Sequence, residues 1–431
     1  MSEGGDAPKF EPVVVIFKPK DKRTYPSLDK QDVVRSVLSD RRRDDIQFFE
    51  ASAHSLGAAP PAVDAHLTAF DVNRFETPIV CVHLTADERA ELEDHPDIAL
   101  IEKDEDFVYA HAGPFHPLRV QGQPPLDTET IPAGVAQINA PAAWGNSQGK
   151  GIRVAILDTG IDDSHPDLAA NVMGGVTFVS GTPTWRDDEG HGTFCAGIVA
   201  AAISGAGIVG VAPQASLYAV KVSDQTGAPT LRSIIAGLDW CIANHMHVIN
   251  MSFGYSEPRM SLYLMCRKAW ESGALLVASV GNDSSRTVTY PAAFDTVVGV
   301  AAIDSTNAHY RPSNTGPGVN ISAPGVNVLS TGLRGGYQTM SGTSAACPHI
   351  SGAAALAWGA HRFAENKEIW HLLASTARGL GDEPKFGKGR VNALAASGEL
   401  VRPRVRLEPI GGRKFDVRRD ENGRRVPVEV P

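Results

Sequence analysis

The stretch RVAILDTG, residues 153–160, carries four apolar residues that lead directly into Asp158 and a glycine turn. An unbroken apolar run of this length is typical of a strand buried on both faces of a parallel sheet. Similar runs follow along the chain, and residues 231–242 between two of them keep a helical period. This alternation predicts an α/β fold, a mostly parallel sheet with helices on both faces. The other expected strands are residues 217–222, 248–251, 275–279 and 296–301.

The rest of the chain divides around this α/β region. Residues 1–110 mix short strand and helix patterns with many charges, which predicts a small α+β domain. Residues 111–128 contain four prolines and two glycines, a composition typical of a linker. The α/β domain then occupies residues 129–398, and residues 399–431 form a charged C-terminal tail. In the first domain we expect strands at residues 13–17, 78–84 and 98–102, and helices at residues 27–39, 64–70 and 86–93.

The composition excludes several classes of protein. The chain has 431 residues, is 42% hydrophobic and has a net charge of −9, whereas a nucleic-acid binder is usually basic. Residues 193–220 lack charge, but glycines and Pro213 divide them, so we expect buried core and no membrane partner. The five cysteines form no C-x-x-C pair and suit free thiols in a reducing compartment. Because the N-terminus also lacks an apolar leader, we expect a cytoplasmic protein; a secreted one, with its leader missing from this sequence, is the alternative.

Four polar side chains stand where a parallel sheet places its site, at strand ends and helix beginnings. Asp158 and Asn282 end buried strands, His191 begins an apolar helix between two glycines, and Ser344 opens an alanine-rich helix. Asp158 could be an orienting carboxylate, Asn282 an amide donor and His191 a general base. Ser344 could be a nucleophile at a helix N-terminus, which favours negative charge. Singly, each has a plainer interpretation: an acidic strand end that binds ribose or metal, a turn asparagine, a capping or buried histidine, and an N-cap serine.

The motifs around these residues occur together in residues 129–394. They are VAILDTGIDDSHPDL at 154–168, HGTFCAGIVA at 191–200, GVAPQASLYAVKV at 210–222, VINMSFG at 248–254, GN at 281–282 and SGTSAACPHISGAAAL at 341–356. The set resembles the subtilisin-like serine proteases (subtilases, peptidase family S8). Asp158, His191 and Ser344 also follow one another in the Asp–His–Ser order of that family.

The resemblance implies a serine endopeptidase that hydrolyses a peptide or protein substrate through an acyl-enzyme intermediate. Ser344 would be the nucleophile, His191 the general base and acid, and Asp158 the carboxylate that orients the imidazole. Asn282 and the Ser344 backbone N–H would form the oxyanion hole. The implied substrate-binding residues are Ser252, Phe253 and Gly254 on one pocket wall, Ala278 and Gly281 on the other, Thr289 at the pocket floor, and Gly227 on a second pairing edge.

The N-terminal region also resembles a known domain. Residues 85–93 and 98–104 are similar to the ferredoxin-like propeptide (inhibitor I9) domain of subtilases. This implies a zymogen whose own propeptide is an intramolecular inhibitor and which cleaves itself between about Tyr109 and Thr128; a permanent accessory domain is the alternative. The chemistry would need no cofactor. Asp167 corresponds to one ligand of a structural calcium ion in relatives, and Glu129 stands near the position of the usual first ligand. We expect a monomer.

Other functions stay open on the sequence alone. A subtilase fold can also transfer the acyl group to an amine, as a peptide ligase or cyclase does. A non-catalytic peptide-binding module predicts a broken triad, whereas all three residue types are present here. A nucleotide-binding α/β protein ranks last, because no G-x-G-x-x-G or Walker pattern follows the first strand of the α/β domain.

Overall fold

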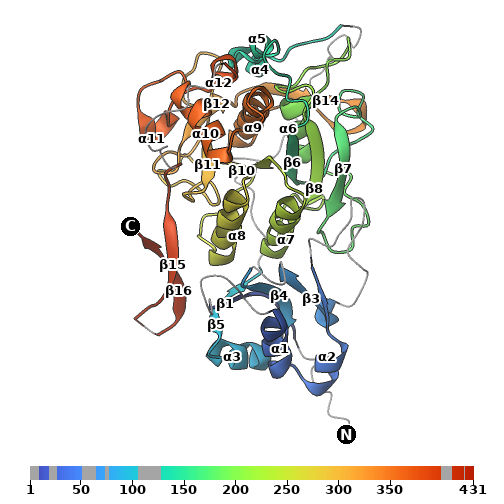
Figure 1. Cartoon of the computed structure of the whole chain (residues 1–431), viewed down its shortest axis with the longest axis vertical. Coiled ribbons are helices and arrows are strands. Elements are labelled where there is room, and N and C mark those ends of the chain that lie inside the picture. Colours follow the sequence, from blue (N-terminus) through green and yellow to red (C-terminus); the bar gives the residue numbers. More distant parts are fainter. Residues whose placement is uncertain are drawn as a thin grey trace.

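The computed structural model describes residues 9–18, 27–50, 65–72, 77–104, 128–398, 410–421 and 423–431. A small N-terminal domain lies below a larger domain, and a C-terminal hairpin runs along one side of both (Figure 1). The elements of the N-terminal domain are β1 (Glu11–Phe17), α1 (Ser27–Val37), α2 (Asp40–Asp45), β2 (Gln47–Phe49), β3 (Thr68–Val72), β4 (Ile79–Leu84), α3 (Ala86–Asp94) and β5 (Ile98–Lys103).

The N-terminal domain is built on a sheet with the strand order β2-β3-β4-β1-β5. Without the edge strand β2, this is the βαββαβ arrangement of a ferredoxin-like domain. The alternating side chains of β1 serve both faces of the sheet. Val13 and Val15 pack against the domain's own helices, while Val14 and Ile16 pack in a cluster shared with the larger domain. Burial of both faces explains why β1 has an unbroken apolar sequence.

One expected helix of this domain is wrong. Residues 65–67 form only a short 3-10 turn, and Thr68–Val72 is the strand β3, which pairs antiparallel with β4. This strand is buried along its whole length and its Asp71 pairs with Lys30, so tertiary contacts override the weak helical period. The helix expected after Thr85 is confirmed, because Thr85 and Glu88 form a capping box at the start of α3.

The larger domain contains a seven-stranded sheet in the order β12-β11-β10-β9-β6-β8-β7. Every neighbouring pair is parallel, as the apolar runs predict. Two strands were not expected: β7, whose sequence contains two glycines, and β12, whose sequence ISAP ends in proline. The strands are β6 (Arg153–Asp158), β7 (Val172–Thr177), β8 (Ser216–Lys221), β9 (Val248–Met251), β10 (Leu275–Ser279), β11 (Val297–Ile303) and β12 (Ile321–Pro324).

Helices cover both faces of this sheet (Figure 1). The helices α6 (His191–Ala200) and α9 (Thr343–Ala360) belong to one apolar cluster, and α7 (Leu231–Ala243) and α8 (Met260–Glu271) to the other. The N-terminal domain packs on the α7 and α8 side. The smaller elements are α4 (Ala133–Gln137), α5 (Ala140–Ala143), β13 (Val328–Thr331), β14 (Tyr337–Met340), α10 (Asn366–Ser375), α11 (Glu383–Phe386) and α12 (Ala393–Ala396).

The C-terminal segment differs from the charged tail expected for residues 399–431. Residues 410–421 and 423–431 are described, and within them β15 (Lys414–Arg419) and β16 (Arg425–Val430) pair as an antiparallel hairpin. Phe415 of this hairpin is buried in the larger domain. A period-two pattern in KFDVRR and RVPVEV signals these strands, although their many charges obscure it. Among the described residues, no helix has the length and apolar character that crossing a membrane requires.

Candidate active site

The fold brings Asp158, His191 and Ser344 to the carboxyl end of β6. Asp158 is the last residue of β6, His191 is the first residue of α6, and Ser344 is the second residue of α9. Gly190 precedes α6 with a φ of 114°, a backbone conformation that suits glycine. A Cβ atom at Gly192 would lie 2.1 Å from the carbonyl oxygen of Gly160, so only glycine lets α6 approach β6 so closely. The two glycines that flank His191 therefore position its ring over the end of β6.

His191 and Asp158 form a buried pair. The His191 Nδ1 atom lies 2.7 Å from Asp158 Oδ1, and both side chains are almost inaccessible to solvent. Asp158 Oδ1 also accepts a hydrogen bond from the Thr159 N–H. Burial opposes the charged imidazolium, but the charge and hydrogen bond of Asp158, helped by Glu189, raise the pKa of His191 above its ordinary value. With its Nδ1 proton directed at the carboxylate, the ring keeps Nε2 for proton exchange.

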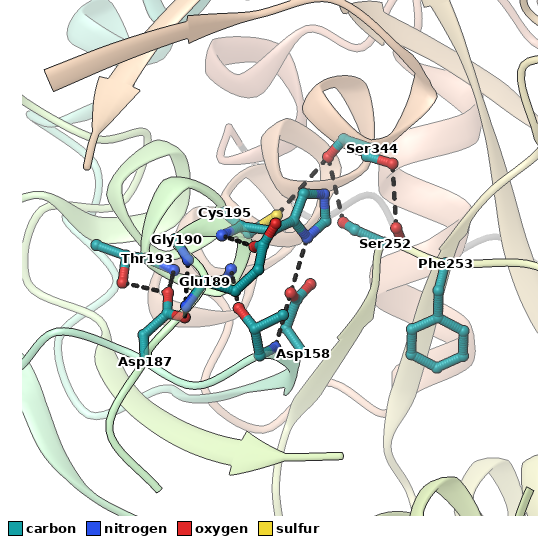
Figure 2. A network of polar contacts seen from close by, with 12 residues as sticks. Asp158, Asp187, Glu189, Gly190, Thr193, Cys195, Ser252, Phe253 and Ser344 are labelled. Atoms are coloured by element: carbon teal, nitrogen blue, oxygen red, sulfur yellow. Dashed lines mark hydrogen bonds and ion pairs between the residues drawn. The ribbon is translucent and has the colours of Figure 1, made fainter. Parts of the chain in front are cut away.

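Ser344 reaches the same cluster from α9, as Figure 2 shows. Its Oγ donates a hydrogen bond to the Ser252 carbonyl oxygen at 3.0 Å, and its own carbonyl oxygen accepts from Ser252 Oγ at 3.2 Å. The Sγ atom of Cys195 lies 3.8 Å from that carbonyl oxygen. Ligand-type atoms of Cys195, His191 and Asp158 lie within 4.8 Å of one another. The structure thus gathers the three residues that the sequence separates by 186 positions, from 158 to 344.

Asn282 lies beside the first turn of α9. It follows β10, and its Oδ1 accepts a hydrogen bond from the Thr343 N–H at 2.8 Å. A Cβ atom at Gly342 would lie 3.3 Å from Asn282 Nδ2, which places the amide group next to the start of the helix. The first N–H groups of a helix have no partner within the helix. The Asn282 amide and the Ser344 N–H are therefore donors of the kind that can stabilise an oxyanion.

Most of the expected substrate-binding residues also come together. Ser252, Phe253 and Gly254 directly follow β9, and Ala278 lies in the adjacent strand β10. A Cβ atom at Gly254 would lie 2.3 Å from Thr289 Oγ1, and one at Gly281 would lie 2.8 Å from Thr289 Cγ2. The Thr289 side chain therefore lies next to both Gly254 and Gly281. Gly227 lies apart in the turn that joins Ser223 to Pro229, and no described contact connects it to Thr289.

Asp167 and Glu129, the two residues expected to bind calcium, both contact the loop of residues 204–208. Asp167 Oδ2 accepts hydrogen bonds from the Ile208 N–H and the Tyr337 hydroxyl, each at 2.9 Å. Glu129 Oε2 accepts from the N–H groups of Ser204 and Gly205, also at 2.9 Å. Each carboxylate therefore holds one end of residues 204–208.

Two groups of polar residues around this site were not expected from the sequence. Asn250, buried within β9, donates to Ser252 Oγ and accepts from Ser351 Oγ, which fixes the residue that contacts Ser344. An asparagine inside the apolar run VINM is itself a signal, because a buried amide needs partners. Asp187 accepts hydrogen bonds from Gly190 N–H and Thr193 N–H at the start of α6. An acidic residue just before a helix could have indicated this anchor.

Comparison with known proteins shows the family to which the chain belongs. The sequence pattern of the subtilase family (peptidase S8) matches residues 149–394. The chain is 39% identical to a thermostable alkaline protease of Halalkalibacterium halodurans, over 75% of this chain and 84% of that protein. It is 39% identical to an M-protease of Shouchella clausii, over 76% of this chain and 81% of the relative. It is 40% identical to subtilisin E of Bacillus subtilis, over 73% of this chain and 79% of the relative.

These relatives correct one expectation and decide the activity. The cytoplasmic location expected from the cysteines and the N-terminus is wrong, because the relatives are secreted extracellular subtilisins and alkaline proteases. Cysteine usage reflects burial here, since all five thiols are buried and free, and so it says little about the compartment. Subtilases need no cofactor for their chemistry. The chain belongs to the subtilase family of subtilisin-like serine proteases and is a serine endopeptidase.

Proposed function

We propose that Ser344, His191, Asp158 and Asn282 hydrolyse peptide bonds through an acyl-enzyme intermediate. The observation that carries the proposal is the buried 2.7 Å contact between His191 Nδ1 and Asp158 Oδ1, next to a serine at a helix N-terminus. Such a pair leaves His191 Nε2 to accept the Ser344 hydroxyl proton. The alternatives of a binding module and a nucleotide-binding protein lose their support, because the family is that of proteases.

The proposed reaction proceeds in two halves. Ser344 Oγ exchanges its bond to the Ser252 carbonyl for one to His191, attacks the substrate carbonyl carbon and gives its proton to Nε2. The Asn282 amide and the Ser344 N–H stabilise the oxyanion. The C–N bond then breaks as His191 returns the proton to the leaving amine. Water then gives a proton to the same imidazole and attacks the acyl carbon. The bond from Ser344 Oγ to that carbon breaks, Oγ takes the proton back from His191, and the acid product leaves.

The outcome of the second half separates an endopeptidase from a peptide ligase. Hydrolysis adds one water to the products, whereas transfer to an amine does not. For a defined peptide substrate, we expect the summed mass of the two products to exceed the mass of the substrate by one water. Ser344→Ala should abolish turnover. A peptide product joined or cyclised without water, as the main product, would favour the ligase.

We propose that an extended substrate pairs with residues 252–254 and 278–281, as a strand added to a sheet edge. Gly227 would supply the second edge. Gly254, Gly281 and Thr289 lie around one space, and Thr289 partly fills its floor, which favours a medium-sized apolar P1 side chain. Thr289→Ala should shift the ratio of kcat/KM values toward larger P1 residues such as phenylalanine, while Thr289→Ser should keep the preference. An unchanged ratio in Thr289→Ala would contradict this pocket assignment.

We propose that the N-terminal domain, within residues 1–110, is a propeptide that stays bound as an inhibitor. Two carboxylates at the end of β5 contact the N-termini of two helices of the larger domain. Glu102 accepts hydrogen bonds from Met260 N–H at 2.6 Å and from Ser261 N–H at 3.0 Å at the start of α8. Asp104 accepts from the Arg232 N–H at 2.8 Å at the start of α7. Helix N-termini favour negative charge, so these contacts support tight docking.

Residues 106–110, which as the end of such a propeptide would occupy the active-site cleft, lie outside the described residues. Most of the expected cleavage region, from Tyr109 to Thr128, also lies outside them. Self-cleavage there stays a prediction. A Ser344→Ala chain should keep its full length during purification, while the wild type should separate into two fragments. Processing of pure Ser344→Ala would contradict self-cleavage, and an uncleaved but active wild type would favour a permanent accessory domain. Sedimentation of the Ser344→Ala chain tests the proposed monomer.

The residues at Asp167 and Glu129 do not fit a calcium cage in this structure. Calcium prefers six or more oxygen ligands. The groups directed at the two carboxylates are N–H and O–H donors, which repel a cation. Ser204 Oγ, the remaining side-chain candidate of the loop, donates to the Ala206 carbonyl. We therefore propose that hydrogen bonds to Asp167 and Glu129 close this loop in place of an ion.

A further inference from the structure

The C-terminal hairpin β15–β16 lies outside the part of the chain that matches the subtilase pattern, which ends at residue 394. In Figure 1 it extends from the larger domain, beside α8, toward the strand β5 of the N-terminal domain. Neither the peptidase chemistry nor the docking through Glu102 and Asp104 uses this hairpin. Its contacts therefore need a separate explanation.

One end of the hairpin is anchored in the larger domain. The Arg413 N–H donates to the Ala293 carbonyl oxygen at 2.8 Å, and Asn320 Nδ2 donates to the Ile410 carbonyl oxygen at 2.9 Å. Phe415 is only 8% exposed. Its ring lies 5.7 Å from those of Tyr263 and Tyr290 and 5.8 Å from that of Phe294, in edge-on geometry that aromatic pairs favour. Backbone pairing and apolar burial together fix this end of the hairpin on the enzyme.

The other strand of the hairpin reaches the N-terminal domain. The guanidinium of Arg425, at the start of β16, donates to the Ile98 carbonyl oxygen, at the start of β5. The strand β5 is at the edge of its sheet, so its outer backbone groups need partners outside that sheet. A cavity of about 540 Å³ separates the surfaces around this contact, lined by Phe17 and Ala99 of the N-terminal domain, Leu264 of α8 and Val417 of the hairpin. The hydrogen bond from Arg425 to Ile98 therefore joins the hairpin to the N-terminal domain at the rim of this cavity.

We propose that the hairpin β15–β16 is a clasp that retains the N-terminal domain on the enzyme after the linker is cut. The clasp holds the start of β5 through Arg425, while the helices α7 and α8 hold the end of β5 through Asp104 and Glu102. Two contacts at opposite ends of one strand prevent the domain from pivoting off either one. The partner of the hairpin is therefore the cleaved N-terminal domain of the same chain, and the inference rests on the proposed role of that domain as an inhibitor.

The test uses the full chain with Ser344→Ala, so that no self-cleavage occurs, and with a recognition site for an unrelated specific protease inserted in residues 111–127. After cutting, native mass spectrometry over a dilution series gives the Kd of the N-terminal domain for the rest of the chain. Arg425→Ala should raise this Kd about tenfold, since a hydrogen bond from a charged group is lost at a partly exposed site. Arg424→Ala, a change at the exposed neighbouring residue, should leave it unchanged. Phe415→Ala should also raise the Kd, by loosening the anchor.

Glu102→Gln separates failure of the clasp from failure of the docking on which it rests. If Glu102→Gln and Arg425→Ala both weaken retention, the clasp is supported. If only Glu102→Gln does so, the hairpin is not a clasp, although the N-terminal domain still docks as an inhibitor would. If neither variant changes the Kd, both proposals are wrong. If Phe415→Ala does not fold, the comparison of Arg425→Ala with Arg424→Ala decides alone.

Discussion

The Nδ1 atom of His191 lies 2.7 Å from Oδ1 of Asp158, with both side chains buried at the carboxyl end of β6. A buried carboxylate is costly unless it is paired, and this contact compensates both groups. It also fixes the imidazole orientation, because one ring nitrogen is committed to Asp158. The ability of His191 to activate Ser344 therefore depends on Asp158, a residue that does not contact the substrate.

Asp158→Asn should lower kcat by about 10⁴-fold, because an amide can stabilise the wrong imidazole tautomer and cannot stabilise the imidazolium. KM should change little, since Asp158 lies behind His191. Steady-state kinetics with a chromogenic peptide measures both constants. The matched variant Asp163→Asn changes an acidic residue whose partner is the exposed Arg186, and it should keep wild-type kinetics. Equal losses in the two variants would contradict the specific role of Asp158.

The pH dependence of the peptidase should report His191. Only the neutral imidazole can accept a proton from Ser344, and Asp158 raises the pKa of His191 above its ordinary value of about 6.5. The kcat/KM should therefore fall, as the pH is lowered, with a midpoint above about 6.5. In Asp158→Asn the acid limb of the residual activity should shift to lower pH, because the group that raises the pKa of His191 is gone. An acid limb that does not move would assign it to another residue.

Asn282→Ala should lower kcat by about 10²–10³-fold with a small change in KM, as removal of one oxyanion donor does. Asn282→Asp is the sharper variant. Its carboxylate can still accept the Thr343 hydrogen bond, but it has no amide hydrogen to donate. Both variants should therefore be slow, while thermal unfolding of Asn282→Asp stays closer to wild type. Near-normal kcat in Asn282→Asp would show that anchoring Thr343, and not donation, is the role of this residue.

The loop held by Glu129 and Asp167 should be stable without a metal. In the Ser344→Ala chain a chelator should leave Tm unchanged. Glu129→Ala should lower the stability by about 1 kcal/mol, because two backbone N–H groups lose their acceptor. Glu129→Gln keeps a carbonyl acceptor and should lose less. A chelator that lowers the Tm of the Ser344→Ala chain, with no such effect once Glu129→Ala is added, would instead establish a calcium site at this loop.

Much of the fold can be predicted from the sequence because the central strands are almost completely buried, which gives them continuous apolar runs. The strands β9 and β10 have the predicted bounds, and β6, β8 and β11 differ from theirs by one or two residues at each end. The edge strand β7 was missed because its sequence VMGGVT contains two glycines, and the register shifts there to follow β8. The C-terminal hairpin was missed because its strands depend on Phe415 being buried by residues more than a hundred positions earlier.

Part of the site can also be predicted from the sequence. Residue types at strand and helix ends, in a fixed order, identify Asp158, His191, Asn282 and Ser344. Their geometry depends on close approaches, such as that of Gly192 to Gly160, that no local pattern encodes. Asn250 and Ser351, which support Ser252 below Ser344, lie a hundred residues apart and show their relation only in the folded protein. The location of the protein could not be deduced from cysteine usage, because burial alone accounts for the free thiols.

The most direct test of the central claim is the intact mass of the protein after reaction with an irreversible phosphonylating reagent directed at activated serines. The wild type should gain one phosphonyl group, and Ser344→Ala should gain none; His191→Ala, which keeps the hydroxyl but lacks the base, should also stay unlabelled. Labelling of Ser344→Ala to the extent of the wild type, or a wild type that cleaves peptides but is never labelled, would contradict the assignment of Ser344 as the nucleophile.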